Sequence, residues 1–218
     1  MTLDRLRPMA DRMLRPFVAA ARGLGLTPDG VSVVAFGCAV VAGGAFVLGG
    51  ASLGSGPGAA LGGVAGGRVW YLLGAVLVFA NGWLDLVDGA LARAQGVDGE
   101  GGDLLDHVLD RYADVAIIAG LAAGADAWAL GLLAVTGVLL TSYLGTQIQA
   151  VGLGREYGGL LGRADRLALT STVAVVAFLL PGELVAGLSA VELLLVLFAV
   201  IGHLTAVQRF WGAWGDLD

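Results

Sequence analysis

The stretch "DLVDGALARAQGVDGEGGDLLDHVLD", residues 85–110, stands in a chain made mostly of alanine, leucine, valine and glycine. All of its charged residues but one are acidic, and the exception is Arg93. This much like charge in an apolar protein is costly unless cations accompany it. The apolar sequence on either side of the stretch decides the fold class, and the acidic residues within it point to the chemistry.

The composition is that of a membrane protein. Of the 218 residues, 57% are hydrophobic and only 14% are charged, so several spans of about 20 apolar residues fit in the chain. The net charge is −6, and all twelve basic residues are arginine. An acidic balance excludes nucleic acid as the expected partner, and we expect membrane lipids to surround the protein.

Apolar segments predict six transmembrane helices and an all-α fold. Their approximate limits are residues 30–50, 68–94, 103–125, 127–151, 162–181 and 186–210. The sequence "GGASLGSGPGAALGGVAGG" at 49–67 predicts a flexible loop, and "LPGE" at 180–183 predicts a turn. No repeat or second domain is evident. We therefore expect one domain over residues 1–218, with the six-helix bundle at 26–211.

Residues 1–25 predict an amphipathic helix that lies at the membrane surface. Apolar residues recur at roughly helical spacing from Leu3 to Ala21, and arginines occupy the other faces. Such a helix buries its apolar face in the membrane interface, and we expect a kink near Pro16. The alternative is a short soluble helix that packs on the rest of the chain.

The arginines predict the orientation in the membrane. Five of them precede the first span, and others lie between spans 2 and 3, between spans 4 and 5, and after span 6. The opposite loops contain only Arg68. Because basic loops stay on the cytoplasmic side, we expect a multi-pass protein of the cytoplasmic membrane. Both termini and the acidic stretch would face the cytoplasm.

The aspartates are spaced to gather on two helical faces. Asp85 and Asp88 are three residues apart, and Asp106 and Asp110 are one turn apart. The turn "GVDGEGG" at 96–102 would bring two such helices together. Oxygen ligands without a His or Cys cluster suit Mg²⁺, Mn²⁺ or Ca²⁺. Two cations framed by four carboxylates can clamp a phosphoryl group.

Small residues and an arginine complete this pattern. Gly89 and Ala92 share a helical face with the first two aspartates, so a bulky ligand could approach the backbone there. Tight helix packing would use such residues too. The planar guanidinium of Arg93 can neutralise a diphosphate. The stretch therefore predicts a metal–diphosphate site at the cytoplasmic membrane boundary.

The complete pattern resembles the signature of the CDP-alcohol phosphotransferases. It reads Asp85-x-x-Asp88-Gly89-x-x-Ala92-Arg93, eight residues, then Gly102-x-x-x-Asp106-x-x-x-Asp110, without a departure. The six-span plan matches this family along the whole chain. The resemblance implies that the protein transfers the phosphatidyl or archaetidyl group of a CDP-linked lipid to a polar alcohol and releases CMP. It also implies a homodimer.

The resemblance further implies roles for single residues. Two divalent cations, Mg²⁺ or Mn²⁺, would be held by Asp85, Asp88, Asp106 and Asp110, and Asp110 would also be the general base for the acceptor hydroxyl. The CDP-lipid would contact Pro28, Asp29, Asp85, Gly89, Ala92, Arg93 and Gly102. The first two belong to "LTPDGVS" at 26–32, which resembles the family's entry to its first span. Asp29 stands there in place of the commoner asparagine.

Arginines near span 5 are the candidates for binding the acceptor. Arg155, Arg163 and Arg166 would attract an anion that the carboxylates repel, and "GRADRLAL" at 162–169 resembles the family region that holds a phosphorylated acceptor. We therefore expect inositol phosphate or glycerol phosphate. Gln147 and Gln149 replace an Arg/Ala/Glu-rich segment of related enzymes, so serine or another unphosphorylated alcohol is an alternative. Arginines that only set the orientation are another.

An aspartate-lined cation channel or transporter is the alternative from a different class. Its carboxylates would follow a path across the bilayer, whereas these gather at one boundary. Spans 1, 5 and 6 also contain few polar residues. The sequence therefore favours a membrane transferase of phospholipid biosynthesis.

Overall fold

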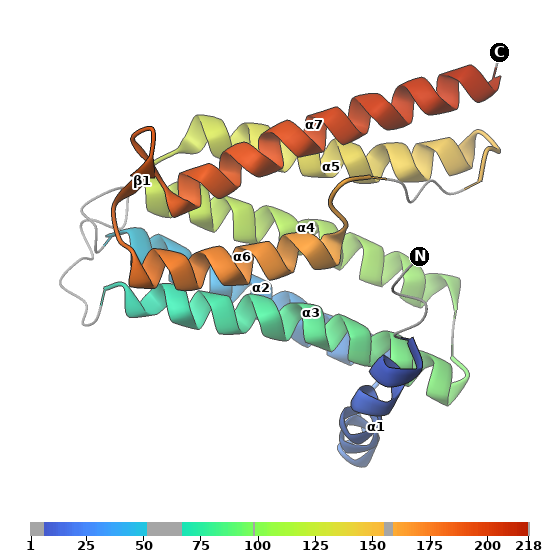
Figure 1. Cartoon of the computed structure of the whole chain (residues 1–218). Coiled ribbons are helices and arrows are strands. Elements are labelled where there is room, and N and C mark those ends of the chain that lie inside the picture. Colours follow the sequence, from blue (N-terminus) through green and yellow to red (C-terminus); the bar gives the residue numbers. More distant parts are fainter. Residues whose placement is uncertain (1–6, 52–66, 98, 155–158, 218) are drawn as a thin grey trace.

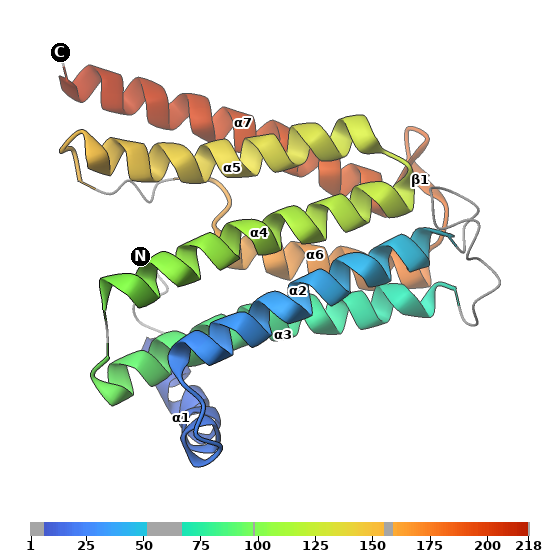
Figure 2. The same cartoon turned by 180° about the vertical axis from the view of Figure 1, so that it is seen from behind.

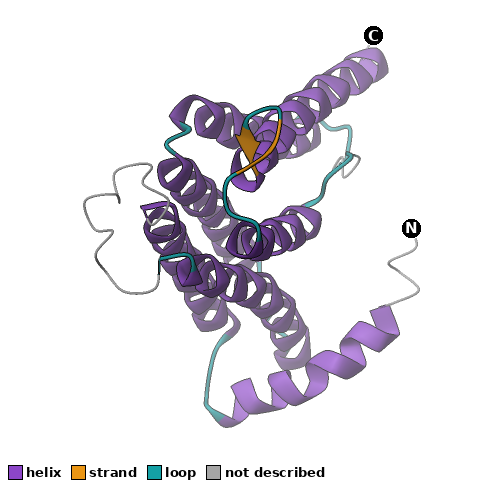
Figure 3. Ribbon diagram, turned by 60° about the vertical axis from the view of Figure 1, so that its left-hand side comes forward, coloured by secondary structure: helices purple, strands orange, loops and turns teal. Residues whose placement is uncertain are grey.

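The computed structural model is a bundle of long helices and describes residues 7–51, 67–97, 99–154 and 159–217. Helices α2 to α7 run along one common axis, and α1 lies across one end of the bundle (Figure 1; Figure 3). A small hairpin precedes α7. The elements are α1 (Arg7–Gly23), α2 (Pro28–Ala51), α3 (Val69–Gln95), α4 (Glu100–Ala125), α5 (Trp128–Ala150), α6 (Arg163–Leu179), β1 (Glu183–Val185), β2 (Leu188–Ser189) and α7 (Ala190–Leu217).

Helices α2 to α6 coincide with the predicted apolar segments to within three residues, whereas α7 begins four residues later and ends seven residues later than predicted. Among the described residues, four helices are long and apolar enough to cross a membrane, namely α2, α3, α5 and α7. The other two differ for physical reasons. Helix α6 has only 17 residues, and the first half of α4 carries the charged residues of the acidic motif.

The all-α prediction missed a short antiparallel hairpin. A turn was predicted at residues 180–183. In the structure, β1 begins at Glu183 and pairs with β2, with Glu183 opposite Ser189 and Val185 opposite Leu188. Strands this short carry too few residues for an alternating pattern to be recognised. The predicted glycine-rich loop at 49–67 lies mostly outside the described residues.

The N-terminal helix packs against α2 and α3. Its Leu14 and Ala21 are buried against Val31, Val87 and Leu91, and Phe17 meets Trp83 edge-on at 5.2 Å between ring centroids. The Arg22 side chain donates a hydrogen bond to the carbonyl of Ala94, at the end of α3. Pro16 lies inside the helix, as the sequence indicates. Helix α1 is therefore attached to the end of the helix that carries the first aspartates.

Close packing of α2 against α3 and α4 sets the position of the motif (Figure 2). A methyl group in place of the Gly120 hydrogen would lie 2.3 Å from the carbonyl oxygen of Gly43, so only glycine allows this approach of α4 to α2. One continuous core then extends through α2 to α7 and includes Phe46, Tyr71 and Phe198. Helix α2 thereby fixes the two helices that carry the aspartates.

Candidate active site

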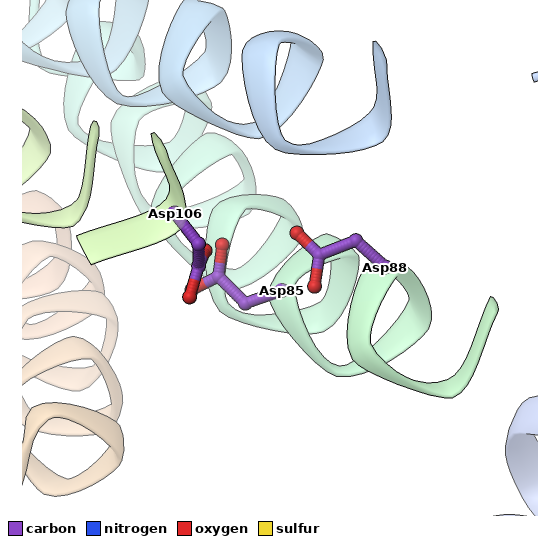
Figure 4. A group of neighbouring side chains, drawn as sticks. All are labelled: Asp85, Asp88 and Asp106. Atoms are coloured by element: carbon purple, nitrogen blue, oxygen red, sulfur yellow. The ribbon is translucent and has the colours of Figure 1, made fainter. Parts of the chain in front are cut away.

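Aspartates from α3 and α4 meet in one cluster. Asp85, Asp88 and Asp106 each offer a carboxylate oxygen, and these oxygens all lie within 4.8 Å of one another. Figure 4 shows the three side chains turned toward the same space. The chain reverses between the two helices at Gly96, whose φ of 66° is readily adopted by glycine. We call these three residues the carboxylate trio.

The carboxylate trio has the chemistry of a site for a hard divalent cation. Its donors are all oxygens, which suit Mg²⁺ and Mn²⁺. Asp88 is 6% exposed, and the other two side chains are partly buried. Three carboxylates this close and this poorly hydrated repel one another strongly unless positive charge lies among them. The residues present therefore fit a metal centre.

Asp110 lies one turn further along α4, with its carboxylate between two arginines. Its Oδ1 forms an ion pair with Arg163 Nη2 at 2.8 Å, and its Oδ2 lies 3.5 Å from Arg111 Nη2. It is mostly buried, with 14% of its side chain exposed. Asp110 therefore lies one turn from Asp106 of the carboxylate trio and in contact with Arg111 and Arg163.

Arg163, the first residue of α6, connects three helices at this point. It donates hydrogen bonds to Asp85 on α3 and, at 3.3 Å, to Asn81 Oδ1 on the same helix, and it forms an ion pair with Asp110 on α4. Asn81 is 1% exposed and donates to the carbonyl of Ala35 at 3.0 Å. Asn81 was not among the residues that the sequence indicated for the site. Its position four residues before Asp85, on the same face of an apolar helix, is the signal that could have found it.

The start of α2 borders the carboxylate trio. Ser32 Oγ donates to Asp88 Oδ2 at 2.7 Å and lies 3.2 Å from the carbonyl oxygen of Pro28. A methyl group added at Gly102 would lie 3.4 Å from Asp29 Oδ1. Pro28, Asp29 and Gly102 are thus gathered beside the aspartates.

The remaining residues of the predicted donor site lie along one face of α3. A methyl group at Gly89 would lie 3.4 Å from Arg93 Nη1, so the guanidinium extends back along this face. Arg93 is exposed and Ala92 is partly exposed. The face therefore offers a solvent-accessible cation next to two small residues and the carboxylate trio.

A cavity of about 520 Å³ opens on the other side of Arg163. Side chains from α4, α5, α6 and α7 line it, and four of them are arginines: Arg111, Arg163, Arg166 and Arg209. We call this cavity the arginine pocket. Four guanidiniums around one cavity create a field that attracts anions. The pocket is large enough for a small polar molecule.

The predicted acceptor arginines are divided by the structure. Arg163 and Arg166 line the arginine pocket, whereas Arg155 lies outside the described residues. The sequence left two roles open for Arg111, in the acceptor pocket or against lipid headgroups, and it did not indicate Arg209 as an acceptor residue. Arg209 donates to the carbonyl of Thr141 at 2.5 Å, which fixes it against α5. In the sequence, an arginine near the end of a long apolar helix indicates only the orientation in the membrane, whereas in the structure Arg209 also lines the cavity.

Comparison with known proteins places this geometry in a family. Residues 25–207 match the family model for CDP-alcohol phosphatidyltransferases, a range that includes the aspartates and three of the four arginines of the arginine pocket, Arg209 being the exception. The chain belongs to the CDP-alcohol phosphatidyltransferase family. It is therefore a membrane-associated transferase of phospholipid synthesis, which confirms the predicted enzyme class over the channel or transporter alternative.

Named relatives point in the same direction. The chain is 31% identical to the archaetidylinositol phosphate synthase of Methanothermobacter thermautotrophicus over 160 residues, which is 73% of this chain and 77% of that protein. Two solved structures of Mycobacterium tuberculosis phosphatidylinositol phosphate synthase are 26% identical to this chain, each with a TM-score of 0.70. The complex with manganese and citrate covers 92% of this chain and 88% of that one. The complex with CDP-DAG covers 93% and 94%.

Proposed function

We propose that the protein transfers the phosphatidyl or archaetidyl group of a CDP-linked lipid to a hydroxyl of inositol phosphate and releases CMP. The observation that carries this proposal is that the carboxylate trio and the arginine pocket adjoin each other at Arg163. One half of this arrangement suits a metal-bound diphosphate, and the other suits an anionic acceptor. The names of the archaeal and bacterial relatives support inositol phosphate as that acceptor.

On the donor side, Asp85, Asp88, Asp106 and Asp110 are the proposed ligands of two divalent cations, Mg²⁺ or Mn²⁺. The oxygen donors of the carboxylate trio support a metal centre, as does the solved relative in complex with manganese. When bound, such cations neutralise diphosphate charge and stabilise the leaving phosphate. The donor contacts of the CDP-lipid are then assigned to residues around this centre: Pro28, Asp29, Asp85, Gly89, Ala92, Arg93 and Gly102.

On the acceptor side, Asp110 is the proposed general base. It lies one turn from Asp106 and contacts Arg163 and Arg111, which both line the arginine pocket. A hydroxyl held in the pocket would therefore reach this carboxylate, which takes its proton. The oxygen forms a bond to the β-phosphorus of the donor. The bond from that phosphorus to the bridging oxygen breaks, and CMP leaves.

The arginines supply the specificity for a phosphorylated acceptor. Arg163 and Arg166 are the proposed acceptor-binding residues, with Arg155 assigned to the same group from the sequence alone. The pocket adds Arg111 and Arg209 to this set. Guanidinium groups bind phosphate through paired, charge-assisted hydrogen bonds. Serine has no phosphate to use them, so it should be a poor acceptor.

The proposed arrangement in the membrane has six spans, with α4 and α6 added to the four apolar helices. Helix α1, the turn between α3 and α4 and the C-terminal end of α7 lie at one end of the bundle (Figure 1). Arginine-rich segments gather there, so this end is assigned to the cytoplasm. Helix α1 would lie in the membrane interface, since Met13 and Phe17 are exposed beside the bundle. Residues 1–218 form one domain in this proposal.

A homodimer is also proposed, from the family resemblance and from the Gly- and Ala-rich sequences of α4 and α5. Light scattering of the detergent-solubilised protein, with the contribution of the detergent subtracted, should give a protein mass equal to that of two chains. A fully active monomer in both detergent and nanodiscs would contradict this part of the proposal.

The test of the activity is an assay of CMP release by the purified protein. CDP-diacylglycerol and its archaeal ether-lipid counterpart would each be combined with inositol phosphate, glycerol phosphate or serine. Rapid CMP release with inositol phosphate and little with serine is the expected result. Efficient turnover of serine would mean that the arginine pocket does not select a phosphorylated acceptor. The absence of CMP release with every combination of donor and acceptor would refute the proposed reaction.

A further inference from the structure

Asp114 is a buried carboxylate to which the proposed reaction gives no part. It lies on α4, one turn beyond Asp110, and its side chain is 4% exposed. Its Oδ2 accepts a hydrogen bond from Arg166 Nη2 at 2.8 Å, and the same oxygen lies 3.7 Å from Arg111 Nη1. A single carboxylate oxygen thus connects an arginine of α6 with an arginine of α4.

Both of these arginines line the arginine pocket. Arg111 also donates a hydrogen bond to Ser142 Oγ on α5. Arg166 is 7% exposed, and its Nε has no hydrogen-bond partner among the described residues. Two guanidiniums on one poorly hydrated wall repel each other, and each is costly to bury without an anion. The negative charge of Asp114 offsets both costs at once.

We propose that Asp114 is a positioning residue that holds Arg111 and Arg166 together as a preformed binding wall for the phosphate of the acceptor. This inference rests on the proposed function and extends it to a residue outside the metal–diphosphate motif. Two guanidiniums fixed side by side present several N–H donors in one geometry, which matches the oxygens of a phosphate dianion. Because the arginines are already ordered, binding does not have to immobilise them.

The test compares Asp114→Asn with the parent enzyme, with KM and kcat measured separately for each substrate. The KM for inositol phosphate should rise about 10- to 100-fold, since a small displacement of binding groups has effects of this order. The KM for CDP-diacylglycerol should stay at the parent value, because the donor side does not use Asp114. The matched control is Asp126→Asn, the same change at an exposed residue at the end of α4, which should leave every parameter unchanged.

A residue with a merely structural role would give a different result. Substitution of such a residue would lower the amount of active enzyme, and hence the apparent kcat with every substrate. The KM for inositol phosphate would not change. That outcome overturns the proposal. The parent enzyme decides the proposed function separately, since a parent that releases no CMP with inositol phosphate refutes the reaction whatever the variants do.

If Asp114→Asn alone fails to fold, the double variant with Arg166→Gln removes both buried charges and avoids an uncompensated one. Its KM for inositol phosphate should exceed that of Arg166→Gln alone by less than the roughly 10- to 100-fold expected for Asp114→Asn by itself, because only the contact of Asp114 with Arg111 is then left to lose. A further increase of the size expected for the aspartate by itself would show independent effects and overturn the inference.

Discussion

The carboxylate trio and the arginine pocket lie next to each other but are built in different ways. The trio comes from two consecutive helices joined by a short turn, and all of its members fall within residues 85–110. The pocket draws its side chains from α4, α5, α6 and α7. Local spacing is therefore enough to bring the metal-site residues together, whereas the acceptor pocket forms only when the four helices pack.

The two regions also differ in how their charge is balanced. The trio brings like charges together, and the contact of Asp85 with Arg163 offsets only part of that charge, so cations from outside the chain are still needed. The arginines of the pocket, by contrast, already lie against protein oxygens, such as those of Asp114 and Thr141. Substitutions in the trio should therefore abolish CMP release with every acceptor. Substitutions in the pocket should weaken the binding of the acceptor only. Arg163 contacts both regions and marks their boundary.

Removal of divalent cations should have the largest effect. In excess EDTA, CMP release should stop completely, since the carboxylates alone would repel the donor diphosphate. Addition of Mg²⁺ or Mn²⁺ beyond the chelator should restore it, and titration of each ion would show which one the enzyme prefers. Undiminished CMP release in EDTA would mean that the carboxylate trio is not a metal centre, and that its charge is balanced within the protein as in the arginine pocket.

Asp110→Asn should have the next largest effect. Loss of a general base lowers kcat by roughly 10²- to 10⁴-fold, while the affinity for the CDP-lipid should be largely kept, because the base acts on the acceptor. Asp85→Asn serves as the matched variant from the trio and should weaken metal and donor binding as well. Kinetic and binding profiles that are the same for both variants would contradict the separate roles assigned to them.

Arg166→Gln should have a smaller and more selective effect. The loss of one charge-assisted contact costs about 1.5–3 kcal/mol, which corresponds to roughly a 10- to 150-fold higher KM for inositol phosphate. The KM for the CDP-lipid should not change. Arg163→Gln is the informative partner, because its contacts with Asp85 and Asp110 predict a loss of kcat as well. A variant of Arg166 that weakens only the CDP-lipid would move this residue to the donor side.

Sequence reasoning succeeded where the signal is local. The helices were located because each needs a long apolar segment, and the aspartates because a 3.6-residue period puts Asp85 and Asp88 on one face. Only the family resemblance assigned Asp29 and Gly102 to one donor site, and the structure shows that these two residues lie close together. These features depend on residues that are close in sequence or on a fixed motif.

The rest depends on contacts that no spacing encodes. Asn81 hydrogen-bonds to residues far from it in sequence, and Arg209 reaches Thr141 from the end of α7. The approach of α4 to α2 depends on Gly43 and Gly120 meeting face to face, although each could equally be part of a flexible segment when read alone. The hairpin of β1 and β2 is too short to leave a pattern. Tertiary packing decides all of these.

Ser32→Ala should have the smallest effect and would show whether the start of α2 supports the carboxylate trio. The buried hydrogen bond from Ser32 to Asp88, 2.7 Å long, fixes one carboxylate oxygen, and its loss costs about 0.5–1.5 kcal/mol. The Mn²⁺ concentration for half-maximal activity should therefore rise roughly 2- to 13-fold, with little change in kcat at saturating metal. Ser171→Ala is the matched control, since the buried hydroxyl of Ser171 has no hydrogen-bond partner among the described residues. Equal metal dependence in the two variants would mean that Ser32 contributes nothing to the trio, and that the aspartates are positioned by α3 and α4 alone.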